Sequence, residues 1–125
     1  MTEQHPLVIT ELRGSVLCIT FNRPDKFNSF NRQLALELQA ALDRAANEAN
    51  IRAVYMTGNG KAFCAGQDLS EAIAPDGPGI QRIVREHYNP VIRMIRSLEK
   101  PVICAVNGVA AGAGANIALA CDIVI

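Results

Sequence analysis

The most informative part of the sequence is residues 100–114, which read KPVICAVNGVAAGAG. A proline introduces the apolar run Val102–Val106, whose length and uninterrupted hydrophobicity predict a buried strand. Asn107-Gly108 then turns the chain, and residues 109–120 are rich in glycine and alanine. Within them Gly112-Ala113-Gly114 is expected to open a helix, so a helix N-terminus follows closely on a buried strand.

The preceding half of the chain predicts further strands and a helix in alternation. Residues 7–12 and 15–21 flank Gly14 and alternate at period two, which is typical of a β-hairpin. Residues 32–49 place their apolar side chains at helical intervals, and residues 51–57 form a second apolar run that predicts a strand buried on both faces. Because strand, helix and strand in this order require a crossover, part of the sheet is expected to be parallel. The fold class is therefore α/β.

Two later segments complete this outline. Residues 75–79 contain two prolines and two glycines and predict a mobile loop. Residues 80–98 keep helical spacing, but Pro90 interrupts the pattern and predicts either a kink or two consecutive helices. A last apolar run, residues 123–125, is expected to be a strand, and because no terminating turn follows it we expect the chain to be truncated.

Composition and charge exclude several classes of protein. Half of the 125 residues are hydrophobic, and 12 basic residues balance 12 acidic ones, which disfavours a disordered chain and a nucleic-acid-binding protein. The longest apolar stretch, residues 109–121, is too short for a membrane span, and residues 1–6 lack the pattern of a signal peptide. Four widely spaced cysteines predict buried free thiols in a reducing, cytoplasmic location rather than disulfides or a metal site; they are Cys18, Cys64, Cys104 and Cys121.

Two glycine-containing segments could carry chemistry. Ala65-Gly66 follows the strand expected at residues 51–57, with Asp68 and Ser70 as candidate helix N-caps, and Gly112-Ala113-Gly114 follows the next buried strand. The N-terminus of a helix leaves backbone N–H groups unpaired and carries partial positive charge. Two such ends can direct N–H groups at one oxygen and form an oxyanion hole. The alternative is that these glycines only allow tight packing of helix against sheet.

Other catalytic interpretations are weaker. Ile117 stands where the third glycine of a dinucleotide-binding motif would be, and residues 58–61 lack the spacing of a phosphate-binding loop. Cys64 is expected to be a core residue rather than a nucleophile. His87 is expected to lie on a helix that mostly serves packing, and Asp68 to be a helix cap rather than a base.

Four motifs taken together resemble the enoyl-CoA hydratase/isomerase (crotonase) superfamily. They are Asn22-Arg23-Pro24, Asn28, the run FCAGQDL at residues 63–69, and residues 100–114. Their order and spacing agree with the family from about residue 7 to residue 125. The resemblance implies a crotonase-like fold of repeated ββα turns, with residues 1–125 as the N-terminal part of the domain.

The resemblance also implies a role for individual residues. The carbonyl oxygen of an acyl-CoA thioester would accept hydrogen bonds from the N–H groups of Gln67 and Ala113, where many relatives have glycine in place of Ala113. The adenine of CoA would lie against the carbonyl of Ala65, and Lys26 would lie near the CoA phosphates. The remaining residues expected to contact the substrate belong to the same two motifs; they are Gly66, Asp68, Leu69, Gly112 and Gly114.

One departure from the family pattern bears on the reaction. Hydratases of the family carry a glutamate where this chain has Asn116, and hydration uses a paired acid and base. The resemblance therefore implies an isomerase acting through a thioester enolate, on a ring-epoxide or unsaturated phenylacetyl-CoA type of substrate. An enoyl-CoA hydratase and a non-catalytic acyl-CoA-binding relative are the alternatives.

The resemblance places further parts of the enzyme outside this sequence. The catalytic carboxylate is expected beyond residue 125, so residues 1–125 alone are predicted to be inactive. The full-length form is expected to be a homotrimer or a dimer of trimers. The reaction is expected to need no metal ion and no cofactor other than the CoA of the substrate, and no nucleic-acid or membrane partner is expected.

Overall fold

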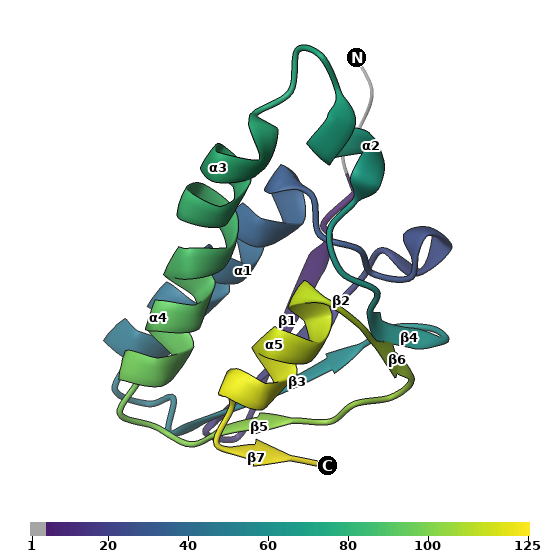
Figure 1. Cartoon of the computed structure of the whole chain (residues 1–125). Coiled ribbons are helices and arrows are strands. Elements are labelled where there is room, and N and C mark those ends of the chain that lie inside the picture. Colours follow the sequence, from purple (N-terminus) through teal and green to yellow (C-terminus); the bar gives the residue numbers. More distant parts are fainter. Residues whose placement is uncertain (1–4) are drawn as a thin grey trace.

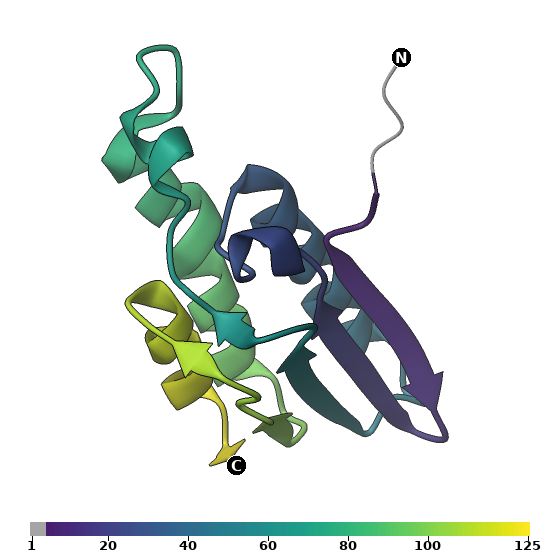
Figure 2. The same ribbon diagram turned by 90° about the vertical axis from the view of Figure 1, so that its right-hand side faces the viewer.

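The computed structural model describes residues 5–125, and Figures 1 and 2 show their arrangement. Residues 1–4, part of the segment on which the expectation of no signal peptide depends, lie outside the described residues. The elements in chain order are β1 (Val8–Arg13), β2 (Val16–Phe21), the 3₁₀ turn η1 (Pro24–Lys26), α1 (Arg32–Asn47), β3 (Ala53–Gly58), β4 (Ala62–Cys64), α2 (Leu69–Ile73), α3 (Gly79–Ile83), the π-helical turn η2 (Val84–Tyr88), α4 (Asn89–Ser97), β5 (Val102–Cys104), β6 (Val109–Ala110), α5 (Ala113–Ala120) and β7 (Ile123–Val124).

Five strands form the main sheet in the order β1-β2-β3-β5-β7. The β1–β2 pair is antiparallel, as the predicted hairpin requires, and every other pair in this sheet is parallel. The prediction of an α/β fold with a partly parallel sheet is thus confirmed. β4 and β6 pair in parallel as a separate two-stranded sheet, which the sequence did not predict.

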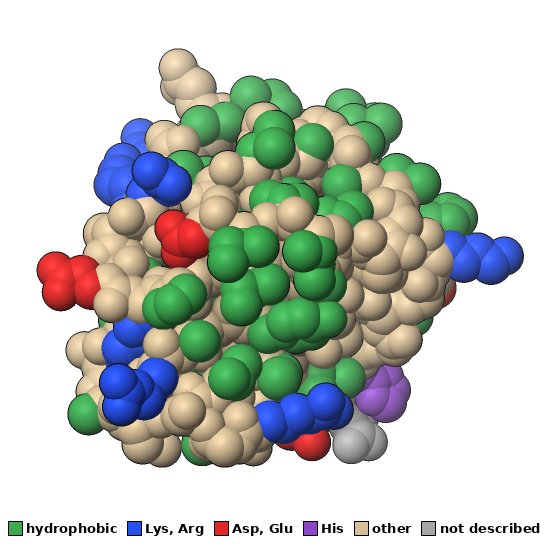
Figure 3. All heavy atoms as spheres, turned by 90° about the horizontal axis from the view of Figure 1, so that it is seen from below, with side chains coloured by type: hydrophobic (Ala, Val, Ile, Leu, Met, Phe, Trp, Pro, Cys, Tyr) green, Lys and Arg blue, Asp and Glu red, His purple; other side chains and the backbone are tan. Residues whose placement is uncertain are grey.

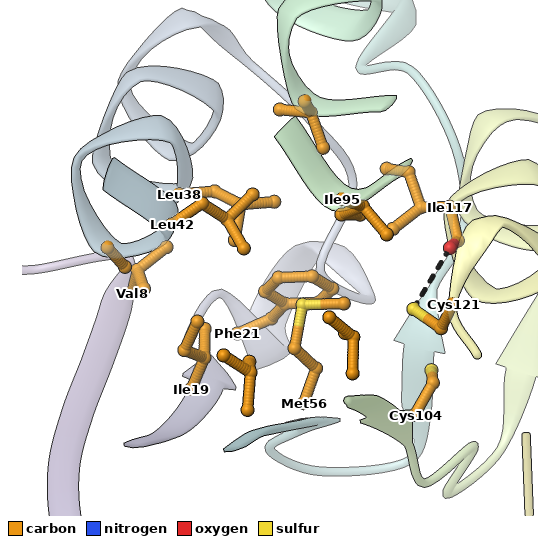
Figure 4. Close-up of a cluster of buried hydrophobic side chains, with 14 of the residues drawn as sticks. Val8, Ile19, Phe21, Leu38, Leu42, Met56, Ile95, Cys104, Ile117 and Cys121 are labelled. Atoms are coloured by element: carbon orange, nitrogen blue, oxygen red, sulfur yellow. Dashed lines mark hydrogen bonds between the residues drawn. The ribbon is translucent and has the colours of Figure 1, made fainter. Parts of the chain in front are cut away.

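The hydrophobic core lies between the main sheet and the helices α1, α4 and α5, which all cover the same face (Figures 1 and 4). Side chains from both layers meet there, including Phe21 and Met56 from the sheet and Leu38, Ile95 and Ile117 from the helices. Six apolar positions predicted the helix at residues 32–49, and five of them are buried on α1: Leu34, Leu38, Ala41, Leu42 and Ala45. Ala49, the sixth, is exposed because the helix ends at Asn47.

The expectation of strands buried on both faces is wrong for the described structure. In β3, Val54 and Met56 are fully buried, whereas Tyr55 and Thr57 are only partly buried. The reason is that the three packed helices lie on one side of the sheet. The same geometry corrects the expectation for Cys18, which is half-buried because it points to the opposite face from its neighbours Leu17 and Ile19. All four cysteines are free thiols, as predicted.

The helical segment predicted at residues 80–98 is not interrupted at Pro90, so two helices separated at the proline are not observed, and a kink there stays a prediction. α3, η2 and α4 follow one another without a break (Figure 1), and the π-helical turn precedes the proline. A proline inside a helix leaves the carbonyl four residues earlier without its donor. Here the side-chain amide of Gln39 supplies that donor, because its Nε2 donates to the carbonyl of Glu86 at 2.8 Å.

The last strand leaves an apolar edge exposed. Hydrophobic side chains gather on the face seen from below in Figure 3, the side on which Figure 1 places β5 and β7. Ile123, Val124 and Ile125 remain between 44% and 70% exposed. Within residues 5–125, no helix has the length and apolar character needed to span a membrane.

Candidate functional site

The two glycine-containing segments leave the small sheet side by side. β4 and β6 are parallel, Cys64 pairs with Ala110, and the N–H of Ala111 donates to the carbonyl of Cys64 at 3.1 Å. Parallel strands end at the same edge of a sheet. The residues after β4 (65–69) and the residues after β6 (111–114) therefore begin next to each other, although they lie more than 40 positions apart in the sequence.

Two glycines, Gly66 and Gly114, let these segments approach closely, and a third, Gly112, supplies an unusual backbone conformation between them. Gly66 has φ +109°, and a Cβ atom there would lie 3.2 Å from the carbonyl oxygen of Ala111 and 3.9 Å from the nitrogen of Ala113. Gly112 has φ +53°, a conformation that residues with a side chain rarely adopt. A Cβ atom at Gly114 would overlap the Cys64 carbonyl. The glycines therefore do allow tight packing between these segments, which was the alternative interpretation. The same packing brings Gly66 next to the first residue of α5.

The N–H group of Gln67 points away from its strand partner. Phe30 donates its N–H to the carbonyl of Gly66 and accepts from the N–H of Asp68, both at 2.7 Å. In a parallel bridge of this kind, the residue between the two bonded peptides directs its own N–H to the other side. In the described part of the chain, the Gln67 N–H donates to no protein acceptor.

The N–H group of Ala113 is unpaired for a different reason. Ala113 is the first residue of α5, where an N–H has no acceptor within the helix. The next N–H, from Gly114, donates to the carbonyl of Ala111 at 2.9 Å, and that of Asn116 donates to the carbonyl of Gly112 at 3.2 Å. Among residues 5–125 the Ala113 N–H has no acceptor. Two unpaired N–H groups thus lie on neighbouring segments, and their convergence on one oxygen stays a prediction.

A pocket of about 360 Å³ lies beside the start of α5. Its walls come from the helical segment at residues 84–92 and from α5, and they include Tyr88, Asn89, Ala113, Asn116 and Ile117. Asn116 is thus placed one helical turn after Ala113, on the wall of the same pocket. The lining residues found in the described chain include no Asp or Glu, so this pocket has no carboxylate of its own to move a proton.

Asp68 is the N-cap of α2, as predicted, and Ser70 lies inside that helix. The Asp68 carboxylate accepts from the N–H of Ser70 at 2.9 Å, and its other oxygen accepts from the Arg23 guanidinium at 2.8 Å. The hydrogen bond from the Ser70 hydroxyl, followed by the bond and charge of Arg23, lowers the pKa of Asp68 to about 2. A carboxylate held in this way stays ionised and paired, which suits a structural cap better than a general base.

Leu69 begins α2 and is 72% exposed. The expected contacts of Leu69 and Asp68 with the substrate stay predictions.

Lys26 lies in a loop that is tied to Ala65. The N–H of Ala65 donates to the carbonyl of Phe27 at 3.0 Å, and the buried Asn28 side chain donates to the carbonyl of Ala62 at 2.8 Å. Lys26 itself is exposed and lines a pocket of about 460 Å³ together with His5 and Arg23. The structure thus places the two residues expected to meet CoA on neighbouring segments; contact with CoA itself stays a prediction. Asn28 is one of the residues that carry the family resemblance, and in the structure its side chain holds this loop in place.

Neither Cys64 nor His87 is available for catalysis. Burial raises the pKa of the Cys64 thiol to about 11, as expected for a core residue. The His87 side chain is completely buried, with its Nδ1 atom 3.9 Å from Glu71 and its Nε2 atom 3.4 Å from Arg32. Burial lowers the pKa of His87; the charges of Glu71 and Glu86 oppose this shift, and those of Arg32 and Arg82 add to it. Over residues 5–125, no cluster of three or more His, Cys, Asp or Glu side chains could hold a metal ion.

Tyr88 is a further residue of the site, and no sequence pattern indicates a functional role for it. Its hydroxyl donates to Oε1 of Gln67 at 2.7 Å, and its ring stacks on Phe30. Tyr88 and Gln67 are 21 positions apart, so no local pattern could have revealed their contact.

Comparison with known proteins agrees with this architecture. Residues 11–125 match the enoyl-CoA hydratase/isomerase family. The chain is 45% identical over 121 residues to the 1,2-epoxyphenylacetyl-CoA isomerase of Escherichia coli K12, covering 94% of this chain and 46% of that protein. It is 48% identical over 115 residues to a probable enoyl-CoA hydratase of Rhodobacter capsulatus, covering 92% and 44%. The chain therefore spans about half the length of these curated relatives.

Solved structures give the same result for the fold. An enoyl-CoA hydratase from Mycobacterium smegmatis superposes with a TM-score of 0.89 at 32% identity, over 96% of this chain and 47% of that one. A putative enoyl-CoA hydratase/isomerase from Mycobacterium abscessus superposes with a TM-score of 0.86 at 39% identity, over 94% and 46%. The family match, the identities and the superpositions all lead to one conclusion: the chain belongs to the enoyl-CoA hydratase/isomerase, or crotonase, family and has its α/β fold.

Proposed function

We propose that the protein is an acyl-CoA isomerase that stabilises a thioester enolate. The observation that carries the proposal is the pair of unpaired N–H groups, Gln67 N and Ala113 N, on neighbouring segments beside a pocket. When a proton leaves the carbon next to a thioester, negative charge develops on the carbonyl oxygen. One preorganised N–H donor lowers the barrier to such a step by about 3–4 kcal/mol, so two donors would supply a large part of the acceleration.

The pocket gives the substrate a place consistent with this chemistry. With the carbonyl oxygen at Gln67 and Ala113, the acyl group would extend along α5 between the apolar side chains of Val84, Ile92 and Ile117. The CoA moiety would leave past Ala65 toward the Lys26 loop. The base that moves the proton would be a carboxylate outside residues 1–125, because Asp68 is held as a helix cap by Arg23.

Asn116 is the reason to propose isomerisation. It lies on the pocket wall where the family's hydratases have a glutamate, and an amide cannot activate water as a base. The E. coli relative, named for its action on 1,2-epoxyphenylacetyl-CoA, supports an aromatic-derived acyl group. Hydration is the second candidate, because a relative of similar identity is named as a probable enoyl-CoA hydratase.

A comparison of the two reactions tests the proposal. The full-length gene product should isomerise 3-enoyl-CoA or ring-1,2-epoxyphenylacetyl-CoA and should hydrate crotonyl-CoA poorly. Restoring the carboxylate with Asn116→Glu should raise hydration at least about tenfold, since a positioned general base contributes a factor of about 10² or more. Asn47→Glu is the matched control, because it adds the same carboxylate at the exposed end of α1. Robust hydration by the unmodified protein would refute the isomerase proposal, and binding without turnover of any ester would favour a non-catalytic relative.

A trimeric or hexameric assembly and a cytoplasmic location remain part of this proposal. The assembly is proposed from the resemblance, and the location is proposed from the four widely spaced cysteines, which are free thiols. Sedimentation of the full-length protein tests the assembly.

A further inference from the structure

The side chain of Gln67 is held by hydrogen bonds at both of its polar atoms. Its Oε1 accepts from the Tyr88 hydroxyl at 2.7 Å. Its Nε2 donates to Glu71 Oε1 at 3.3 Å and to the carbonyl of Asp68 at 3.1 Å. The residue whose backbone N–H is the proposed oxyanion donor is therefore fixed through its own side chain.

Tyr88 is itself anchored to the core. Its ring stacks on Phe30 with a centroid separation of 5.3 Å and an interplanar angle of 20°, and Phe30 packs edge-on against Phe21 at 5.9 Å. Phe30 also forms the two backbone hydrogen bonds that flank Gln67. One aromatic pair thus supports Gln67 from two directions, through its peptides and through its side chain.

The segment that follows Gln67 is held by polar contacts rather than by buried side chains: Asp68 accepts from Arg23 at 2.8 Å, and Glu71 accepts from the N–H of Arg32 at 2.9 Å. α2 contains no buried residue, and the side chains at its two ends, Leu69 and Ile73, are 72% and 78% exposed. Segments with few buried contacts open most easily. The orientation of the Gln67 peptide therefore depends on hydrogen bonds, namely the two that Phe30 makes with the neighbouring peptides and the one that Tyr88 donates to the Gln67 side chain.

We propose that Tyr88 is a positioning residue, which uses its hydroxyl and the Gln67 side chain to hold the Gln67 N–H in line with the substrate carbonyl. This inference rests on the proposed function and adds a residue outside the two glycine-containing motifs. Burial raises the pKa of the Tyr88 hydroxyl. The hydroxyl therefore stays protonated and able to donate.

The test uses a thioester labelled with ¹³C at its carbonyl, phenylacetyl-CoA, bound to the full-length protein. Polarisation by the two N–H groups should move the carbonyl signal downfield from its position in free phenylacetyl-CoA. Tyr88→Phe keeps the ring on Phe30 and removes only the hydroxyl, so it should lose a large part of this shift. It should also lower kcat about three- to tenfold, the effect of one hydrogen bond, with KM within about twofold. Tyr55→Phe, on the opposite face of the sheet, is the matched control and should behave as the wild type.

A second variant tests the link through the Gln67 side chain. Gln67→Met keeps the backbone N–H but removes both side-chain hydrogen bonds, so it should reproduce the Tyr88→Phe effect. The double variant should lose no more than either single one, because residues that act through one contact are not additive.

The outcomes separate the inference from the function on which it rests. A Tyr88→Phe variant with a wild-type carbonyl shift and kcat, or additive losses in the double variant, would overturn the positioning role alone. Binding of phenylacetyl-CoA to the wild type with no carbonyl shift would overturn the proposed oxyanion site, and the positioning role with it.

Discussion

Substitution of Gly114 by alanine tests the close contact between α5 and β4. An added Cβ would overlap the carbonyl oxygen of Cys64. It would also lie 2.8 Å from the carbonyl carbon of Cys64 and 2.8 Å from the Cβ of Cys64. None of these atoms is the flexible end of a side chain. Since carbon atoms pack at about 3.5 Å, the two carbon contacts alone would require helix and strand to separate by about 0.7 Å, and the closer carbonyl oxygen would require more.

Two effects of opposite sign decide the outcome. Alanine is favoured over glycine inside a helix by about 1 kcal/mol, so helix propensity alone predicts a more stable protein. Overpacking of a tight contact costs about 1–3 kcal/mol and occasionally more, and a clash with backbone atoms belongs at the upper end of that range. We therefore expect Gly114→Ala to lower the free energy of unfolding by about 2 kcal/mol.

Urea denaturation of the full-length protein measures this change, and turnover of a CoA ester measures its effect on the site. Gly114→Ala should also reduce kcat, because a displaced α5 carries the Ala113 N–H with it. Gly14→Ala is the control. A Cβ at Gly14 would meet nothing within 4 Å, so the only destabilisation comes from placing alanine at a φ of +61°. It should lower stability without changing kcat. A Gly114→Ala protein as stable as the wild type would refute the reasoning.

Three further predictions concern titratable groups. Because the pKa of Asp68 in the folded protein is about 2 and its ordinary value is 3.8, its stabilising effect is complete above pH 3.8 and is lost as the pH falls through 2. Asp68→Asn should therefore cost about 1–2 kcal/mol at pH 7, and urea curves should show the difference vanishing toward pH 2. His87 has a folded-state pKa below 6.5, so the wild type should lose stability as the pH falls below 6.5. The His87→Leu variant should lose less stability over the same pH range. An equal loss of stability in both proteins would contradict a lowered pKa of His87. At pH 8 an alkylating reagent should modify the half-buried Cys18 before Cys64, whose thiol pKa is about 11; peptide mass spectrometry reads the order.

Local patterns in the sequence predicted the features that depend on neighbouring residues. The alternation around Gly14 predicted the β1–β2 hairpin, and the 3.6-residue period predicted α1. Asp68 and Ser70 were both candidate N-caps, and Asp68 is the one that caps α2. Each of these is set by interactions within a few positions along the chain.

Features that depend on distant contacts were missed or misjudged. The mostly apolar run at residues 51–57 predicted burial on both faces, but Tyr55 is only partly buried because the helices cover one side. The spacing around Pro90 could not show that Gln39, on another helix, supplies the missing donor. The bond between Tyr88 and Gln67 likewise exists only because the fold brings α2 beside η2. The small β4–β6 sheet, which places the two candidate N–H groups together, is a contact of the same distant kind.

The central claim is that Gln67 N and Ala113 N bind the same oxygen. A crystal structure of the full-length protein with bound phenylacetyl-CoA tests it most directly. The thioester carbonyl oxygen is expected to lie about 2.7–3.1 Å from both nitrogens, with the phenyl ring in the pocket that Asn116 lines. A thioester oxygen that reaches only one of the two nitrogens, or that lies elsewhere on the protein, would contradict it.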